Sequence, residues 1–214
     1  DGEGNIRYSK DGIKLYDYGN GDNAGMVRSL FPNSNALSET RLNKSLSEGN
    51  AFNGTGFIDV TFLKDFKFTF NGGVALDETR MTSTRNPWFG QFASEKGMVS
   101  KAHQRQFDVN LQQILNYTHQ FDRHNVNVMI GHESYSEKTY YLAAGKSHML
   151  TQDNDELAGA IIDTQNANSY RSEYFNEGYF SRVMYDFDNK YFFSGSFRRD
   201  ASSRFHPKHR WGNF

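Results

Sequence analysis

Apolar and polar residues alternate along much of this chain, beginning near Gly56. Ile58, Val60 and Phe62 occupy every second position of one stretch, and a longer alternating stretch follows at 66–76. Successive side chains of a β-strand point to opposite faces of the sheet. The alternation therefore predicts two strands joined by a short turn at 64–65.

Two more pairs of stretches repeat this pattern. Residues 105–118 and 124–135 flank a turn at 119–123, and residues 175–185 and 191–199 flank a polar turn at 186–190. One face is mainly apolar, with Phe66, Phe68, Phe70, Val74, Phe107, Val109, Leu111, Val126, Val128, Ile130, Tyr191, Phe193 and Phe197. The other is polar, with Lys67, Asn71, Asp108, Asn110, Asn125, Asn127 and Arg198. We therefore predict an all-β, antiparallel chain of about six strands.

The segments between these strands differ in length and composition. Residues 1–54 are rich in Asn, Gly, Ser and Asp and lack the alternation, so we expect a loop-rich segment there. It would contain at most a weak strand over 13–18 and a short strand or helix around 25–30. The connections 80–104 and 136–170 are long, whereas the three hairpin turns are short.

Strand length and loop asymmetry distinguish a soluble sheet from a membrane barrel. Several predicted strands exceed the ~5–6 residues usual in soluble sheets and reach the ~9–11 residues that span a bilayer. Short turns at one end and long loops at the other are typical of outer-membrane barrels. We therefore expect residues 55–214 to form consecutive hairpins of a transmembrane β-barrel, and residues 1–54 to be mostly extracellular loop.

A barrel in the outer membrane needs at least about eight strands, more than are predicted here. An open sheet in lipid would leave unpaired backbone groups at both edges. The chain starts with Asp1 and stops in a strand-like run at Phe214, so both ends have the appearance of cuts. We expect a segment of a longer polypeptide.

Composition narrows the possible functions. The formal net charge of -1 gives no support for nucleic-acid binding. Because the sequence has no cysteine, disulfide scaffolds, thiolate metal sites and cysteine nucleophiles are excluded. No apolar run approaches the ~18–20 residues of a membrane-spanning helix.

The candidate metal motifs are weak. His132-Glu133 lacks the second histidine of a zinc-protease motif, because position 136 is Ser136, and we expect both residues to be polar lumen residues. The acidic run 153–156 has oxygen ligands suited to Ca²⁺ but lacks the EF-hand spacing, which favours a solvated acidic loop. We predict no catalytic residues, no metal, no cofactor and no enzymatic activity.

Two groups of residues are candidates for contact. Trp88, Phe89 and Phe92 in the first long connection, with Tyr140 and Tyr141 beyond a strand end, would contact substrate or a partner, or form an aromatic girdle. Arg198, Arg199 and Arg204 belong to the basic C-terminal cluster. We expect them to pair with carboxylates in the lumen or on a plug, Asp200 being nearest and Glu173 or Glu177 the alternatives.

Several stretches resemble the barrel portion of SusC/RagA-type TonB-dependent transporters from Bacteroidetes. They are FLKDF at 62–66, NLQQILNY at 110–117, HNV at 124–126, GHESY at 131–135, NEGYFSR at 176–182 and the whole of 191–214. The resemblance runs in order from about Asn53 to the end. It implies a plugged outer-membrane barrel of roughly 22 strands, a SusD-like surface lipoprotein as partner, and energy from TonB–ExbB–ExbD. The plug and the TonB box are not in this sequence.

The resemblance therefore implies nutrient import, of oligosaccharides or of peptides, without bond chemistry. The sequence does not distinguish the two cargo classes. A soluble all-β carbohydrate-binding module is the alternative, followed by a β-rich glycoside hydrolase.

Overall fold

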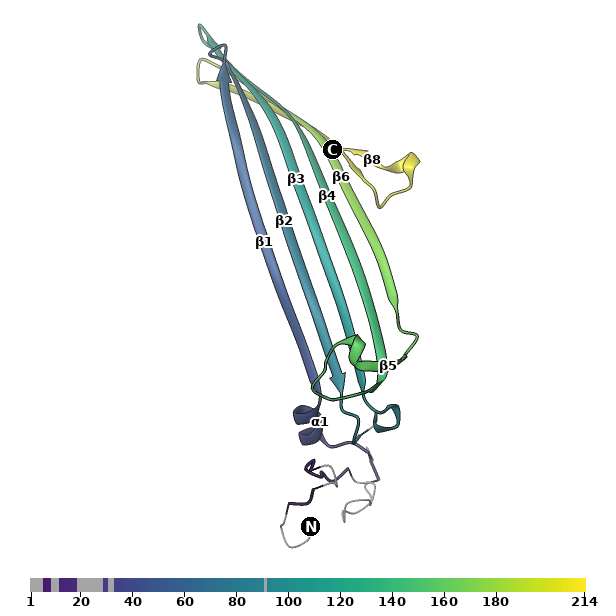
Figure 1. Cartoon of the computed structure of the whole chain (residues 1–214). Coiled ribbons are helices and arrows are strands. Elements are labelled where there is room, and N and C mark those ends of the chain that lie inside the picture. Colours follow the sequence, from purple (N-terminus) through teal and green to yellow (C-terminus); the bar gives the residue numbers. More distant parts are fainter. Residues whose placement is uncertain (1–5, 9–11, 19–28, 31–32, 91) are drawn as a thin grey trace. The chain divides into compact units, whose positions relative to one another are not determined.

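The computed structural model describes residues 6–8, 12–18, 29–30, 33–90 and 92–214. Its strands form one open sheet in the order β1-β2-β3-β4-β6-β7-β8, with β5 paired to β4 (Figure 1). The strands are β1 (Lys44–Phe62), β2 (Phe66–Arg85), β3 (Met98–Phe121), β4 (His124–Met149), β5 (Ala160–Asp163), β6 (Asn168–Phe187), β7 (Tyr191–Ser202) and β8 (Trp211–Asn213). The all-β, antiparallel prediction is confirmed, and β5 and β8 add to the expected strands.

The helical elements described in the structure are short. They are α1 (Ala36–Leu42) and the 3₁₀ turns η1 (Ala93–Glu95), η2 (Leu157–Gly159) and η3 (Pro207–His209). Asn35 caps α1, because its side-chain oxygen accepts a hydrogen bond from the Ser38 backbone N–H at 3.0 Å. None of the helices in the described part of the chain is long and apolar enough to cross a membrane.

Contacts divide the chain into two units. The loop unit comprises Asp1–Glu48, Thr79–His103 and Tyr141–Ser169, and the hairpin unit comprises Gly49–Glu78, Gln104–Tyr140 and Tyr170–Phe214. Among the described residues, the buried hydrophobic side chains are Tyr16, Tyr18, Val99 and Ala160. All four lie in the loop unit.

The tight turns of the hairpin unit use left-handed backbone. Leu63 and Lys64 have φ of 49° and 64°, Asp122 has 53°, and Asp188 and Asn189 have 57° and 53°. At the last turn the Lys190 N–H donates to the Phe187 carbonyl at 3.0 Å. Two consecutive positive φ angles match the twist of antiparallel strands, as in a type I′ turn.

Side chains of the hairpin unit sort onto two faces as predicted. On the polar face, Asn71 donates to the Gln112 side-chain carbonyl across β2 and β3 at 2.8 Å. On the apolar face, the rings of Phe66 and Tyr117 contact each other across the same two strands, with their centroids 4.8 Å apart. The apolar face is uncovered, since Ile130 is 52% exposed and Phe193 is 66% exposed.

A row of neighbouring rings, some stacked and some tilted, crosses the turn end of the hairpin unit. Neighbouring centroids lie 4.8–6.1 Å apart along Phe62, Phe66, Tyr117, His119, Phe121, His124, Tyr185 and Phe187. His119 Nδ1 also lies 2.9 Å from an Asp65 carboxylate oxygen, and His124 Nδ1 lies 2.7 Å from the Tyr185 hydroxyl. Both histidines of the row therefore have a hydrogen-bonding partner for one ring nitrogen.

Strands extend beyond the alternating stretches, so the loops are shorter than the pattern indicates. β1 begins at Lys44, inside the segment expected to be loop, and β4 continues to Met149. In the added length the large apolar residues, such as Leu46, Phe52 and Leu142, are too few and too widely spaced to show a period of two. Over 13–18 the structure shows a single isolated bridge, between Tyr8 and Lys14. Most of the element expected around 25–30 lies outside the described residues.

Candidate functional site

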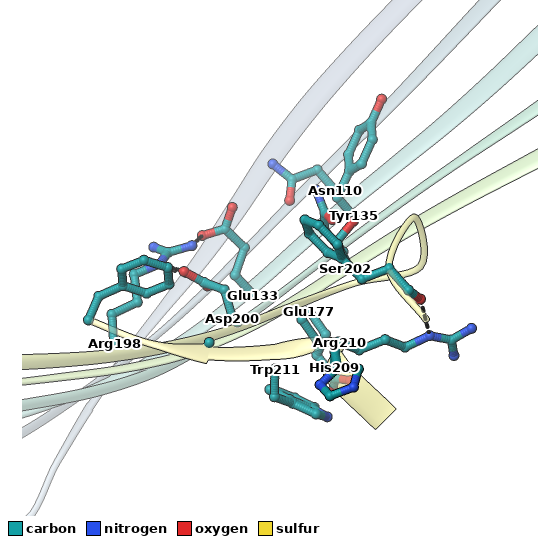
Figure 2. A pocket seen from close by; sticks show the side chains of 16 residues that line it. Asn110, Glu133, Tyr135, Glu177, Arg198, Asp200, Ser202, His209, Arg210 and Trp211 are labelled. Carbon is teal, nitrogen blue, oxygen red and sulfur yellow. Dashed lines mark hydrogen bonds and ion pairs between the residues drawn. The ribbon is translucent and has the colours of Figure 1, made fainter. Parts of the chain in front are cut away.

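A hollow of about 620 Å³ lies in the hairpin unit beside the end of β7 (Figure 2). Strands supply much of its polar lining, and the segment between β7 and β8 supplies much of the remainder. The lining includes Asn110, Glu133, Tyr135, Asn176, Asp200, Ser202, Phe205, His209, Arg210, Trp211 and Phe214. It combines amide and hydroxyl groups, both signs of charge and aromatic rings.

Arg198 is the centre of the charged group in this hollow. Its Nε donates to both carboxylate oxygens of Asp200, at 2.9 and 2.8 Å, and its Nη2 lies 3.8 Å from a Glu133 oxygen. The guanidinium also lies over the Phe180 ring, 5.7 Å from its centroid. These side chains are one-third to one-half exposed, so solvent screens the pairs and their contribution to folding is small. Their effect is to hold one cation and two anions at fixed positions on the polar face.

Two glycines make room for this arrangement. Gly178 lies opposite Asp200 in the β6–β7 register, and a Cβ at position 178 would lie 2.4 Å from an Asp200 carboxylate oxygen. A Cβ at Gly131 would lie 2.3 Å from atoms of the Phe180 ring, which therefore lies close to the backbone of β4. Neither position has room for a larger residue without displacing a side chain that contacts Arg198.

The segment after β7 folds back through a few specific hydrogen bonds. The Ser202 N–H donates to the Arg210 carbonyl at 3.2 Å, and Arg210 Nε donates to the Phe205 carbonyl at 3.1 Å. The backbones of Arg198 and Phe214 exchange hydrogen bonds of 3.0 and 2.8 Å. Pairing of β8 with β7 therefore brings Phe214 to the hollow beside Arg198, whereas the Trp211 ring lies with Arg199 on the other face.

The site is suited to binding, since it presents hydrogen-bonding and stacking groups. Among the described residues, no group of three or more His, Asp or Glu side chains is placed to hold a metal ion. Glu133 and Arg198 come from strands far apart in the sequence. Their common face follows from alternation, but only the pairing register shows that they meet.

The four residues expected to pair in the lumen are not one cluster. Arg198 pairs with Asp200, the nearest of the expected carboxylates. Arg199 points to the opposite face, where its guanidinium lies 5.1 Å from the Trp211 ring centroid. Glu177 accepts hydrogen bonds on the apolar face, and Arg204 lies 4.6 Å from the Tyr174 ring centroid. His132 and Glu133 likewise lie on opposite faces of β4, so they do not share the polar face as expected.

The aromatic residues of the first connection pack within the loop unit. The Phe89 ring stacks on Tyr18 at 5.6 Å, and the Arg85 guanidinium lies 5.5 Å from the Phe92 ring centroid. The backbone N–H groups of Trp88 and Phe89 donate to the buried side chain of Asn86, at 3.1 and 2.9 Å. Asn86 in turn donates to the Asn43 side chain at 2.9 Å. The loop is therefore anchored beneath its aromatic residues, which remain partly exposed.

The two tyrosines beyond the strand pattern lie on β4. Tyr140 is 44% exposed and belongs to the hairpin unit. Tyr141 is half-buried and belongs to the loop unit, where it lines a hollow of about 400 Å³ among Ser45, Ser83 and Ser100. Successive strand positions place these two rings on opposite faces.

The acidic run 153–156 is tied to two lysines of the loop unit. Asp155 forms an ion pair with Lys44, and Lys101 Nζ lies 2.7 Å from a Glu156 oxygen. The Lys44 hydrogen bond lowers the pKa of Asp155 below its ordinary value of 3.8. Gln152 also donates to the Leu42 carbonyl at 2.7 Å. Asp153, Asn154 and Glu156 are exposed, as expected of a solvated acidic loop. The pairing with lysines of β1 and β3 was not expected, because the sequence pattern does not bring those strands near the loop.

Comparisons with known proteins identify the fold. No family profile and no curated protein matches the chain. A solved structure of the RagAB peptide importer in its closed-closed state matches 95% of this chain and 22% of its own, with 22% identity and a TM-score of 0.79. The structure of the open-open state matches 99% of this chain and 22% of its own, with 21% identity and a TM-score of 0.75. A structure of the RagAB peptide transporter matches 81% of this chain and 20% of its own, with 23% identity and a TM-score of 0.73.

This chain therefore spans about a fifth of the length of these solved chains. At this level of identity the likeness is one of fold. The open antiparallel sheet has the fold of a segment of those importer chains.

Proposed function

We propose that this chain is part of the wall of a SusC/RagA-type, TonB-dependent transporter in the outer membrane. The transporter would import oligosaccharides or peptides together with a SusD-like surface lipoprotein. Peptide is the cargo named for the RagAB importers, whose fold this chain shares.

The uncovered apolar face carries the proposal. Exposed apolar patches of more than a few hundred Å² are rare on soluble monomers. In the hairpin unit the apolar face presents Val60, Ile130 and Phe193 at 47%, 52% and 66% exposure, and no described element covers them. Lipid acyl chains would cover such a face, and the row of rings at its turn end resembles the aromatic girdle of outer-membrane barrels.

The polar face then faces the lumen. Its charged group around Arg198, together with Asn110 and Tyr135, offers hydrogen bonds to cargo or to a plug. The loop unit carries the partly exposed rings of Trp88, Phe89 and Phe92 on the side expected to meet cargo and the lipoprotein. Binding and gating need no bond to be made or broken. TonB–ExbB–ExbD would act through parts of the transporter outside this sequence.

The test uses the complete protein that contains this chain. We expect it to sediment with outer membranes, to need detergent for extraction, and to run as a heat-modifiable band in gels. A deletion strain should lose growth on either peptide or oligosaccharide as the limiting nutrient, and the complete gene should restore it. A complete protein that stays soluble without detergent and binds glycan would instead support the carbohydrate-binding module.

A further inference from the structure

A belt of polar side chains interrupts the apolar face of the hairpin unit. His132 Nδ1 lies 2.7 Å from the Gln113 side-chain oxygen, and His132 Nε2 lies 3.1 Å from a Glu177 carboxylate oxygen. The Tyr179 hydroxyl donates to the same Glu177 oxygen at 2.9 Å. The Tyr179 ring lies 4.8 Å from the His132 ring. The belt therefore crosses β3, β4 and β6 as one connected group.

Two further residues continue the belt across β7 and β8. The Trp211 ring lies 6.0 Å from Tyr179, and the Arg199 guanidinium lies 5.1 Å from the Trp211 centroid. Arg199 is exposed and makes no ion pair with a described residue. Glu177, by contrast, is bonded to two partners. Arg199 is thus the charge of the belt that is available to an anionic ligand.

An apolar hollow of about 400 Å³ adjoins the belt. Its walls include Phe68, Leu115, Ile130 and Phe197, and His132 and Tyr179 lie at its edge. On β4 the apolar positions between the turn and the belt are Val126, Val128 and Ile130. On β4 the belt therefore lies at the end of this apolar run that is farther from the turn, whereas on β3 Leu111 continues the apolar face beyond Gln113.

We propose that the belt and the hollow form a binding site for an anionic phospholipid of the surrounding membrane. The phosphate would bind the Arg199 guanidinium, whose planar donors suit phosphate oxygens. An acyl chain would lie in the hollow, and Tyr179 and Trp211 would lie at the headgroup level, where such rings are favoured. The inference rests on the proposed membrane function, because it takes the apolar face to contact lipid.

The test measures lipid retention by the complete protein. The protein is reconstituted in an equimolar mixture of dimyristoylphosphatidylglycerol and dimyristoylphosphatidylcholine, and the bound lipids are counted by native mass spectrometry. We expect enrichment of phosphatidylglycerol over phosphatidylcholine. The loss of a charge-assisted hydrogen bond in Arg199→Gln should lower that enrichment about tenfold. Arg182→Gln is the matched control, because Arg182 is exposed on the opposite face of β6 and should leave the enrichment unchanged.

A second variant tests the hollow. Ser181 lines it, and Ser181→Trp should fill it and reduce retention of the bound lipid while the heat-modifiable band is kept. Equal phosphatidylglycerol retention by wild type and Arg199→Gln would overturn the lipid site. Release of the lipid by millimolar inorganic phosphate would overturn it as well, by showing a simple anion site. Failure of the complete protein to enter membranes would contradict the proposed function itself, whereas an inserted barrel without lipid preference contradicts only the lipid site.

Discussion

Of the glycines on the polar face, Gly131 leaves the least space for a Cβ, which would lie 2.3 Å from the Phe180 ring. The Phe180 ring packs against its backbone from the neighbouring strand, and the Arg198 guanidinium covers that ring. A glycine inside a strand usually marks a close approach of this kind. The same ring could not lie there if position 131 carried any side chain.

We expect Gly131→Ala to destabilise the complete protein by about 1–3 kcal/mol, the usual cost of overpacking. The added methyl would displace the Phe180 ring and weaken its contact with Arg198. The measurement is the temperature at which the heat-modifiable band unfolds in detergent. Gly56→Ala is the control, because nothing lies within 4 Å of a Cβ at that position. An unchanged transition in Gly131→Ala would contradict the packing described here.

The turn between β6 and β7 depends on two residues in the left-handed region. Asp188 and Asn189 have φ of 57° and 53°, which a β-branched residue disfavours. We expect Asn189→Ile to cost about 1–2 kcal/mol, and Asn189→Gly to keep or raise stability, since glycine adopts this φ freely. Thermal unfolding of the complete protein in detergent measures both. Equal stability of the Ile and Gly variants would show that the turn tolerates other backbone angles.

The loop between β4 and β5 is held by side chains at several points. Asp155 pairs with Lys44, Glu156 with Lys101, and Gln152 bonds the Leu42 carbonyl. Because Lys44 lowers the pKa of Asp155, this pair is fully formed above the ordinary aspartate pKa. Its contribution is lost as the pH falls through the lowered pKa.

We therefore expect amide hydrogen exchange in residues 150–159 to be slow at pH 5–7, as the protein's Lys44–Asp155 pair stays charged there. Below about pH 4 the exchange, corrected for its intrinsic pH dependence, should become faster. Asp155→Asn should show the fast behaviour at every pH. Asp153→Asn serves as the control, because Asp153 is exposed and makes no ion pair with a described residue. A loop that responds equally to both substitutions would contradict the tether.

The alternation of apolar and polar residues predicts the turns of the hairpins but not the outer ends of the strands. Alternation located the three hairpin turns, because turn residues and hydrophobic period are local properties of the chain. It missed the start of β1 at Lys44 and the end of β4 at Met149, where apolar residues do not alternate regularly with polar ones. The segment β8 is too short to show a period and is recognised only through its pairing with β7.

The two faces of the sheet predict opposite responses to added charge. Leu111 lies in the middle of the apolar face, and its neighbour Asn110 lies on the polar face beside the hollow. In a membrane barrel, lysine near the centre of the lipid face costs about 2–4 kcal/mol, whereas lysine in the lumen is tolerated.

We expect Leu111→Lys to lower the stability and the membrane yield of the complete protein. Asn110→Lys, the adjacent control, should fold normally and at most alter uptake. The measurements are urea-induced unfolding in lipid vesicles and the fraction of heat-modifiable protein in outer membranes. A larger defect in Asn110→Lys than in Leu111→Lys would reverse the assignment of the two faces.

For the whole molecule, the sequence alone determined the alternating parts of the six long strands, the tight turns, the two faces of the sheet and its antiparallel hairpins. These follow from side-chain alternation and turn chemistry, which act between near neighbours. Only the tertiary structure decided which residues meet: Arg198 with Glu133, His132 with Glu177, and Lys44 with Asp155. The register of backbone hydrogen bonds sets these contacts between strands and loops distant in the sequence, and no local pattern encodes it.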